Sequence, residues 1–517
     1  GFASDSFTLN GELTVTDGWF FVESKDVNLN ASVIAQAGSG NTADDDYPEL
    51  NNGSIVINAG AGGVTLDAVG FIETTAAQAG KDSGSISINS VGSVTLDGAL
   101  ITAGSHNTAG DAGDGGLVDV QVSSSLLSVS VADIDTRGGH ATDDGTADGV
   151  GVGTGGDAGS LYLRTGTGSN LTLSASITAG GGAGTTVGSS ADVTFDDSVV
   201  LAGTDVRIDT VGGNGGGAND GNITFDNAIT GSANLILTAG AGEMSLGGAI
   251  EARSLTIESA ALVTITNNVT TSASDGIDLT ATNISLAPPE TLEPLDPPPA
   301  LTLDSTNGNG LVRFNGDVLL GAPVAVVRGS GAVTFEGNVN SEDGQYHSLT
   351  IMGGSGQGAT APGDVRFKQA VGSTSLGRLG GLEIDTSGIL TIDSGATIAL
   401  NGAFQQTSVA GTGSVALGAD ITTADTNGAD LLFASPVTLT LSVSLNSGTG
   451  DGDIRFADSV EGDAGTALDL TLASGAGDIF FNGAVGQTDR LGNVTINQVA
   501  NVTIGGESAA SGAAFSA

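Results

Sequence analysis

The sequence predicts an all-β fold, a parallel β-helix (β-solenoid) with Gly/Asp-rich loop insertions. Short stretches throughout the 517 residues alternate apolar and polar positions and are rich in Val, Ile and Thr. These stretches recur, and a unit without its loop is about 20 residues long, as in a solenoid whose coils share one core. Aromatic residues make up only 4% of the chain, which suits a narrow interior filled by aliphatic side chains.

The first repeat covers roughly residues 30–230. In it an apolar stretch ends in Ile, is followed by Thr or Ala, and enters a Gly-rich loop. Each loop then returns to an alternating stretch, such as SIVI at Ser54 or SISI at Ser85. The Ile anchors of this pattern are Ile34, Ile72, Ile101, Ile134, Ile177 and Ile208. The pattern predicts coils with loops inserted at one recurring corner.

The second repeat has the form [VI]-x-F-x-x-x-[VI] and dominates the rest of the chain. Turn-forming residues mostly follow the Phe, so the spacing of four is not helical. The Phe residues of this motif are Phe195, Phe225, Phe314, Phe335, Phe367, Phe456 and Phe481. We expect them to form one internal aromatic stack, which need not be contiguous.

A proline-rich segment interrupts the repeats. Residues 287–299 contain six of the ten prolines, and proline cannot donate to a strand ladder. The sequence therefore predicts a β-helix segment with long Gly/Asp-rich loops at 1–286, a Pro-rich excursion at 287–300, and a β-helix segment with the Phe motif at 301–517. The excursion is a surface loop, a hinge or a docking motif.

Charge and composition exclude several classes of function. The net charge of −45 disfavours nucleic acid and anionic membranes as partners. The absence of Cys removes disulfides, thiolate metal sites and thiol nucleophiles. No apolar run is long enough for a transmembrane helix, so we expect no membrane insertion. No catalytic motif is present, which predicts a protein that is not an enzyme.

Several segments resemble a known family. TAGAGEMSLGGAI (238–250) and SGAGDIFFNGAVGQTDRLGNVTI (474–496) are similar to the repeats of filamentous-haemagglutinin-type bacterial exoproteins, which are large surface adhesins, and so is the Ile/Thr/Gly pattern from Ile208 to Ile223. This resemblance implies a right-handed helix, secretion to the cell surface, and a role in adhesion, aggregation or extracellular structure. The family's amino-terminal secretion domain, with its Asn-Pro motifs, is not visible here. The family brings no catalytic residue with it.

Acidic loops offer candidate ligands for calcium, because hard cations prefer carboxylate and carbonyl oxygens in flexible loops. The candidates are Asp44, Asp45, Asp46, Asp111, Asp114, Asp143 and Asp144. A solvated acidic surface is the alternative interpretation. No other cofactor is expected.

Two histidines lie in loops of consecutive coils, so His106 and His140 are expected side by side. With Asp111 and Asp143 they are candidates for a transition-metal site, and two exposed loop histidines are the simpler interpretation. Arg313, Arg366 and Arg455 are expected at outward positions, where they balance nearby Asp or bind an acidic glycan or the acidic face of a neighbour.

Two functions from different classes remain. The first is a structural protein at the cell surface or outside the cell, either a self-assembling filament subunit or an adhesin stalk, whose partners are other copies, joined end to end or through loops, and a glycan or cell surface. The Trp19-Phe20-Phe21 cluster near the amino end would cover that end or bind a neighbour. The second is a polysaccharide-acting β-helix enzyme, a lyase or hydrolase.

Overall fold

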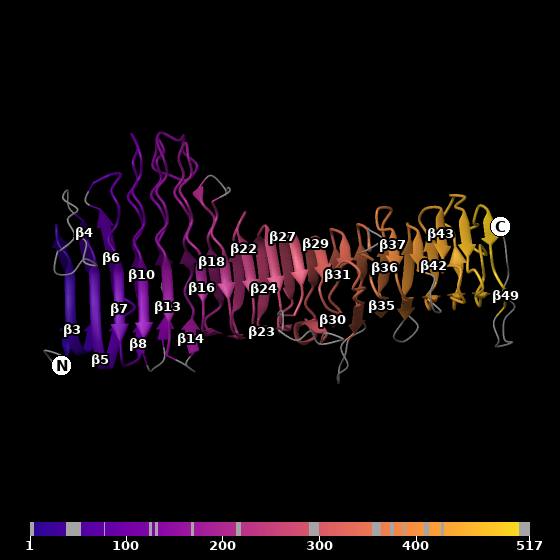
Figure 1. Cartoon of the computed structure of the whole chain (residues 1–517), viewed down its shortest axis with the longest axis horizontal. Helices are drawn as coiled ribbons and strands as arrows, with labels where there is room; N and C mark the ends of the chain where they lie inside the picture. The colour runs from indigo at the N-terminus through magenta and orange to yellow at the C-terminus, as the bar shows by residue number, and fades with distance from the viewer. Residues whose placement is uncertain are drawn as a thin grey trace. The chain divides into compact units, whose positions relative to one another are not determined.

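The computed structural model describes residues 5–37, 53–76, 78–123, 127–129, 133–166, 170–213, 219–288, 299–353, 363–372, 377–385, 388–407, 413–424 and 429–505. Its secondary structure is nearly all β-strand. The described residues contain no α-helix, and a 3-10 turn spans Thr306–Gly308. The strands form long parallel sheets, an arrangement compatible with a β-solenoid (Figure 1).

The chain divides into two compact units, residues 1–263 and 264–517, and β25 (Leu262–Ile265) lies at the division. The proline-rich residues 289–298 fall outside the described residues, so the boundaries predicted at 287–300 stay predictions.

In the first unit each strand position recurs once per coil and pairs in parallel with the equivalent strand of the next coil, which gives three ladders. The first ladder contains β3 (Phe20–Leu29) and β5 (Ile55–Leu66) through their first halves, β7 (Ile86–Ser90), β10 (Val118–Val122), β13 (Leu161–Arg164), β16 (Val193–Phe195), β19 (Ile223–Phe225) and β22 (Glu243–Leu246). The second contains β1 (Phe7–Leu9), the second halves of β3 and β5, β8 (Val94–Leu96), β11 (Leu127–Val129), β14 (Asn170–Leu173), β17 (Ser198–Leu201), β20 (Ile229–Gly231) and β23 (Ile250–Ala252). The third contains β2 (Leu13–Thr16), β4 (Val33–Ala37), β6 (Phe71–Ala76), β9 (Ala99–Ile101), β12 (Ile134–Asp135), β15 (Ile177–Thr178), β18 (Asp205–Asp209), β21 (Asn234–Thr238) and β24 (Ser254–Ser259).

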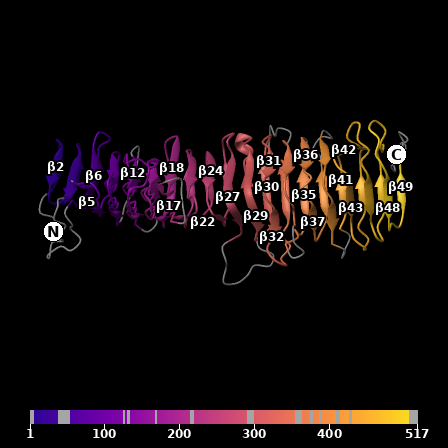
Figure 2. The same cartoon turned by 90° about the horizontal axis from the view of Figure 1, so that it is seen from above.

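In the second unit the strands again follow one another along the chain (Figure 2), and their pairings give three parallel ladders. The first contains the first halves of β27 (Ile277–Leu286) and β29 (Val312–Leu320), then β31 (Val333–Phe335), β34 (Val365–Phe367), β36 (Ile389–Ile392), β39 (Ser414–Leu417), β42 (Val437–Leu439) and β45 (Val460–Glu461). The second contains the second halves of β27 and β29, then β32 (Val339–Ser341), β37 (Ile398–Leu400), β40 (Ile421–Thr423), β43 (Val443–Asn446), β46 (Leu470–Ala473) and β48 (Val494–Asn497). The third contains β26 (Val269–Thr271), β28 (Leu301–Asp304), β30 (Val324–Arg328), β33 (Leu349–Gly353), β35 (Leu382–Asp385), β38 (Phe404–Thr407), β41 (Leu431–Phe433), β44 (Ile454–Phe456), β47 (Ile479–Phe481) and β49 (Val502–Ile504).

The core of each unit is a set of apolar rows, because alternate residues of every strand point inward. One row of the first ladder is buried from Ile55 onward and consists of Ile55, Ile86, Val118, Leu161, Val193, Ile223 and Met244. A coil alone could not bury these side chains, so stacking supplies the hydrophobic stabilisation.

Two of the predicted Ile anchors are off by one residue. In the third ladder Ile72 pairs with Val33 and with Leu100, so the inward residues are Val33 and Leu100 rather than Ile34 and Ile101. Both neighbours are apolar, and a shift of one residue exchanges the two faces of a strand. Apolar spacing could not resolve that choice.

The predicted single Phe stack is wrong, because the rings form separate stacks on different ladders. In the first unit Phe195 stacks on Phe225, with ring centroids 4.5 Å apart. In the second unit Phe314, Phe335 and Phe367 stack on the first ladder, at 4.7 and 5.0 Å. A further stack on the third ladder consists of Phe404, Phe433, Phe456 and Phe481, at 5.1, 5.2 and 5.3 Å. Phe404 and Phe433 do not fit the sequence motif.

Candidate functional site

The Gly-rich segments of the first unit form a bundle that projects beyond the strands (Figure 1). We call residues 102–116, 136–159 and 178–190 the glycine bundle. Each segment leaves the third ladder and returns to the first. At the base of the first segment the buried Thr102 closes the loop, as its Oγ1 donates to the carbonyl of Gly116 at 2.6 Å.

Backbone hydrogen bonds join successive segments of the bundle along the stack. On the outgoing side the N–H of Gly104 donates to Arg137 O at 2.8 Å, and the N–H of Gly138 donates to Gly180 O at 3.1 Å. On the returning side the N–H of Ala158 donates to Ser189 O at 2.8 Å. These bonds continue the strand ladders into the bundle.

A second set of backbone bonds crosses between outgoing and returning segments. The N–H of Gly156 donates to Gly139 O at 3.0 Å, and the N–H of Gly182 donates to Gly156 O at 2.8 Å. A Cβ on Gly156 would overlap the carbonyl oxygen of Gly113, and one on Gly182 would overlap that of Gly139. The crossing bonds therefore exist only because these residues have no side chain.

Asp carboxylates form a third set of hydrogen bonds between successive segments. The backbone N–H of Asp114 donates to Asp82 Oδ1 at 2.9 Å, that of Asp157 donates to Asp114 Oδ1 at 2.7 Å, and that of Ser189 donates to Asp157 Oδ1 at 2.6 Å. We call such a bond, from a carboxylate to the N–H of a later coil, an aspartate staple. Burial is the main cause that raises the pKa of Asp114, and the N–H of Asp157 opposes that rise.

Aspartate staples also occur in the second unit. The N–H of Asp453 donates to Asp430 Oδ1 and the N–H of Asp478 donates to Asp453 Oδ1, both at 2.8 Å. Neighbouring coils are about 4.8 Å apart, and the short Asp side chain spans this distance when it accepts a hydrogen bond from a backbone N–H. This gives a structural reason why the chain contains 44 Asp and only 14 Glu.

The predicted calcium ligands take different places. Asp44, Asp45 and Asp46 lie outside the described residues. Asp111 and Asp114 lie on a returning segment, where Asp111 Oδ1 accepts the N–H of Thr154 at 2.7 Å. No group of three His, Cys, Asp or Glu that could hold a metal occurs in the part of the chain that the structure describes.

The other two candidates lie in the connection between the outgoing and returning segments. Asp143 Oδ1 accepts the N–H of Val150 at 2.8 Å. Asp144 Oδ1 accepts the N–H of Thr146 at 2.9 Å and its hydroxyl at 2.6 Å, and these bonds lower the pKa of Asp144. Four of the seven candidate carboxylates thus have a local structural role, and calcium binding stays a prediction.

The two loop histidines lie side by side, as predicted. The rings of His106 and His140 are stacked, with centroids 4.9 Å apart and planes 11° from parallel. The backbone N–H of His140 donates to His106 Nδ1 at 2.8 Å, and that of Ala183 donates to His140 Nδ1 at 2.9 Å. An Nδ1 that accepts a hydrogen bond from a backbone N–H cannot also ligate a metal. In the neutral form of such a ring the proton lies on Nε2.

Burial lowers the pKa of both histidines. For His140 the neighbouring His106 and then Arg137 lower the pKa further, and Asp135 opposes them. For His106 the second cause is Arg137, again opposed by Asp135. Arg137 is itself paired with Asp135 through Nε at 2.9 Å. The surroundings therefore favour the neutral rings that the two Nδ1 bonds require.

The three outward arginines have local partners. Arg313 forms two hydrogen bonds of 2.8 Å to Asp278, and Arg366 Nε donates to Asp393 at 2.9 Å. The guanidinium of Arg455 lies 4.0 Å from the ring centroid of Phe480. The predicted balancing of Asp is confirmed for the first two.

Arg328 is a buried residue that the sequence interpretation missed. It is fully buried, donates to the carbonyls of Gly363 at 3.0 Å and Asp385 at 3.1 Å, and burial lowers its pKa to about 10. Its Nε has no hydrogen-bond partner among the described residues. Period-two counting from Val324 and Val326 would have placed it inward.

No protein-family model, curated protein or solved structure matches the chain. In the described residues no helix is long and apolar enough to cross a membrane.

Proposed function

We propose that the protein is a right-handed parallel β-helix with a structural, non-catalytic role outside the cell or at its surface, as a self-assembling filament subunit or an adhesin stalk. The resemblance to filamentous-haemagglutinin-type repeats supports the handedness, the location and the adhesive role. The use of acidic side chains as staples between coils supports a structural role, because those carboxylates are engaged in holding coils together.

The observation that carries self-assembly is the state of the outermost described coils. Val502 and Ile504 of β49 are in register with the buried Ile479 and Phe481, yet they are 40% and 49% exposed. Phe7 and Leu9 of β1 likewise continue the second ladder of the first unit and are only half-buried. Exposed apolar rows in register with a buried core form a surface that a further coil can cover, and we propose that a second copy supplies this coil.

Sedimentation velocity over a range of protein concentrations, with electron microscopy of the same samples, tests this proposal. We expect reversible association that Ile504→Lys abolishes, because a charge in the apolar row opposes stacking of a further coil. Ile389→Lys is the matched control, since Ile389 is 46% exposed but lies within the second unit, and it should associate like the unmodified chain. Particles that stay single at every concentration refute self-assembly.

Incubation of the protein with polysaccharides separates the structural role from the enzymatic alternative. We expect the chain length of the polysaccharide to stay unchanged. Depolymerisation would replace the structural proposal with a polysaccharide-acting enzyme.

A further inference from the structure

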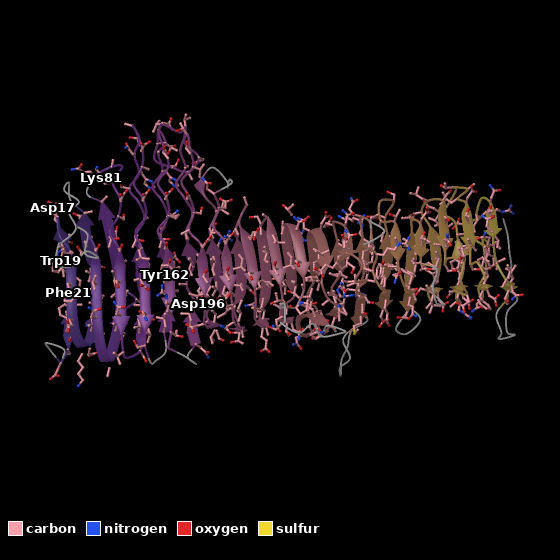
Figure 3. All side chains as sticks on the ribbon, viewed as in Figure 1. Asp17, Trp19, Phe21, Lys81, Tyr162 and Asp196 are labelled. Carbon is pink, nitrogen blue, oxygen red and sulfur yellow. The ribbon has the colours of Figure 1, made fainter. Side chains whose placement is uncertain are left out.

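Aromatic side chains are exposed on one sheet of the first unit. Trp19, Phe21 and Tyr162 are 39%, 36% and 41% exposed, and they are the aromatic members of the exposed large apolar residues in the described chain. All three belong to the first ladder or to the residue that leads into it (Figure 3). Most described Phe side chains instead stack inside the core, so these rings are an exception.

The strand register places two of these rings in a single outward row. Phe21 pairs with Val56, Val56 with Ser87, Ser87 with Asp119, and Asp119 with Tyr162. Four coil steps therefore separate the two rings, which is about 19 Å at about 4.8 Å a step. Trp19 lies two residues before Phe21 and extends the aromatic end of the row.

Both ends of the row are held in place by neighbours. Trp19 and Phe21 form an edge-to-face pair with centroids 6.3 Å apart. The guanidinium of Arg164 lies 4.5 Å from the ring centroid of Tyr162. Rings fixed before a ligand arrives lose little conformational entropy on binding.

Polar side chains occupy the surface between and beside the rings. The adjacent outward row is Glu23, Asn58, Asn89, Gln121 and Arg164. Asn89 Nδ2 donates to Asn58 Oδ1 at 3.2 Å, which orients both amides. Within the aromatic row, Asp119 places a carboxylate next to Tyr162 in the register.

We propose that this surface binds an extended neutral oligosaccharide. Flat aromatic faces stack on the apolar faces of sugar rings, and amides and carboxylates exchange hydrogen bonds with sugar hydroxyls. Glu23, Asp119 and the net charge of −45 repel acidic sugars. The apolar area is two small groups separated by polar side chains, not the contiguous apolar centre of a protein interface.

Isothermal titration of the full chain with cellohexaose, chitohexaose and hexagalacturonate tests the proposal. We expect one of the two neutral probes to bind and the acidic probe not to bind. Tyr162→Ala and Trp19→Ala should each weaken binding about tenfold, the loss expected for one aromatic contact. Phe480→Ala is the matched control, because Phe480 is also an outward ring under an arginine but lies in the second unit.

Three results overturn the proposal: no binding of either neutral probe, preferred binding of hexagalacturonate, or unchanged affinity in both Tyr162→Ala and Trp19→Ala. Circular dichroism of each variant establishes that it is folded. Repeating the titration on Ile504→Lys separates this inference from self-assembly, because the sugar surface predicts unchanged binding there.

Discussion

Substitution of one glycine in the bundle measures how far the crossing backbone bonds stabilise it. At Gly182 an added Cβ overlaps Gly139 O, and the same residue forms two bonds, from its N–H to Gly156 O at 2.8 Å and from the N–H of Gly188 to its carbonyl at 2.9 Å. In an unobstructed position Gly→Ala usually stabilises a protein by about 0.4–1 kcal/mol. In Gly182→Ala the two segments must move apart instead.

The magnitude follows from what that movement loses. Two backbone hydrogen bonds contribute about 0.5–1.5 kcal/mol each, and overpacking costs about 1–3 kcal/mol where the neighbours cannot yield. We therefore expect the free energy of local opening of the bundle to fall by about 2–6 kcal/mol. At about 1.4 kcal/mol for each factor of ten, amide hydrogen exchange in the bundle should accelerate by a factor of at least about 30.

Hydrogen exchange followed by mass spectrometry checks this expectation on peptides from residues 136–159 and 178–190. Exchange of the strands β13 and β16 should change far less, because the ladders retain their own bonds. Gly11→Ala is the control, since nothing lies within 4 Å of its added Cβ. Equal exchange in Gly182→Ala and the unmodified chain would refute the account of the bundle.

Three further outcomes are expected. Phe433→Ala should lower the free energy of unfolding in denaturant by about 3–5 kcal/mol, since Phe433 is fully buried between two rings, and a loss below about 1 kcal/mol would contradict the stack. Burial lowers the pKa of His106 and His140 from 6.5, so these side chains bind protons more readily in the unfolded chain than in the folded one. The bundle should therefore keep its full stability above about pH 6.5 and lose stability as the pH falls. Hydrogen exchange between pH 7.5 and 5 measures this loss, and the variant with both residues changed to Asn should not show it. Asp453→Ala should lower the melting temperature, because the N–H of Asp478 loses its acceptor, whereas Asp453→Asn keeps an acceptor oxygen and should melt close to the unmodified chain; equal melting of both variants would argue against the staple.

The sequence predicted the strands well where one face of the strand alone is apolar. The stretches at Ser54 and Ser85 lie on one ladder in mutual register, and in SISI the period-two alternation states directly which side faces the core. At Ile34 and Ile101 two adjacent apolar residues removed that distinction. The Phe motif failed to predict a single stack for another reason. It describes the turn between one strand and the next, and the same kind of turn joins different pairs of ladders.

The glycine bundle could not be predicted in the same way. Its stabilising bonds join backbone to backbone, and glycine offers no side chain whose pattern records the partner. The sequence therefore shows that Gly138 or Gly156 tolerates close approach but not what approaches it. The acidic loop residues were interpreted as metal ligands because a carboxylate that accepts a backbone N–H has the same sequence signature as one that binds an ion.

The aspartate staples have a direction. In each of them the carboxylate belongs to an earlier coil and the N–H to a later one, as in Asp82 to Asp114 and Asp430 to Asp453. A coil already in place thus presents these carboxylate acceptors to residues of the next coil. Since chains are made from the amino end, each coil finds its docking groups ready as it emerges, and the protein is suited to fold in order, one coil at a time.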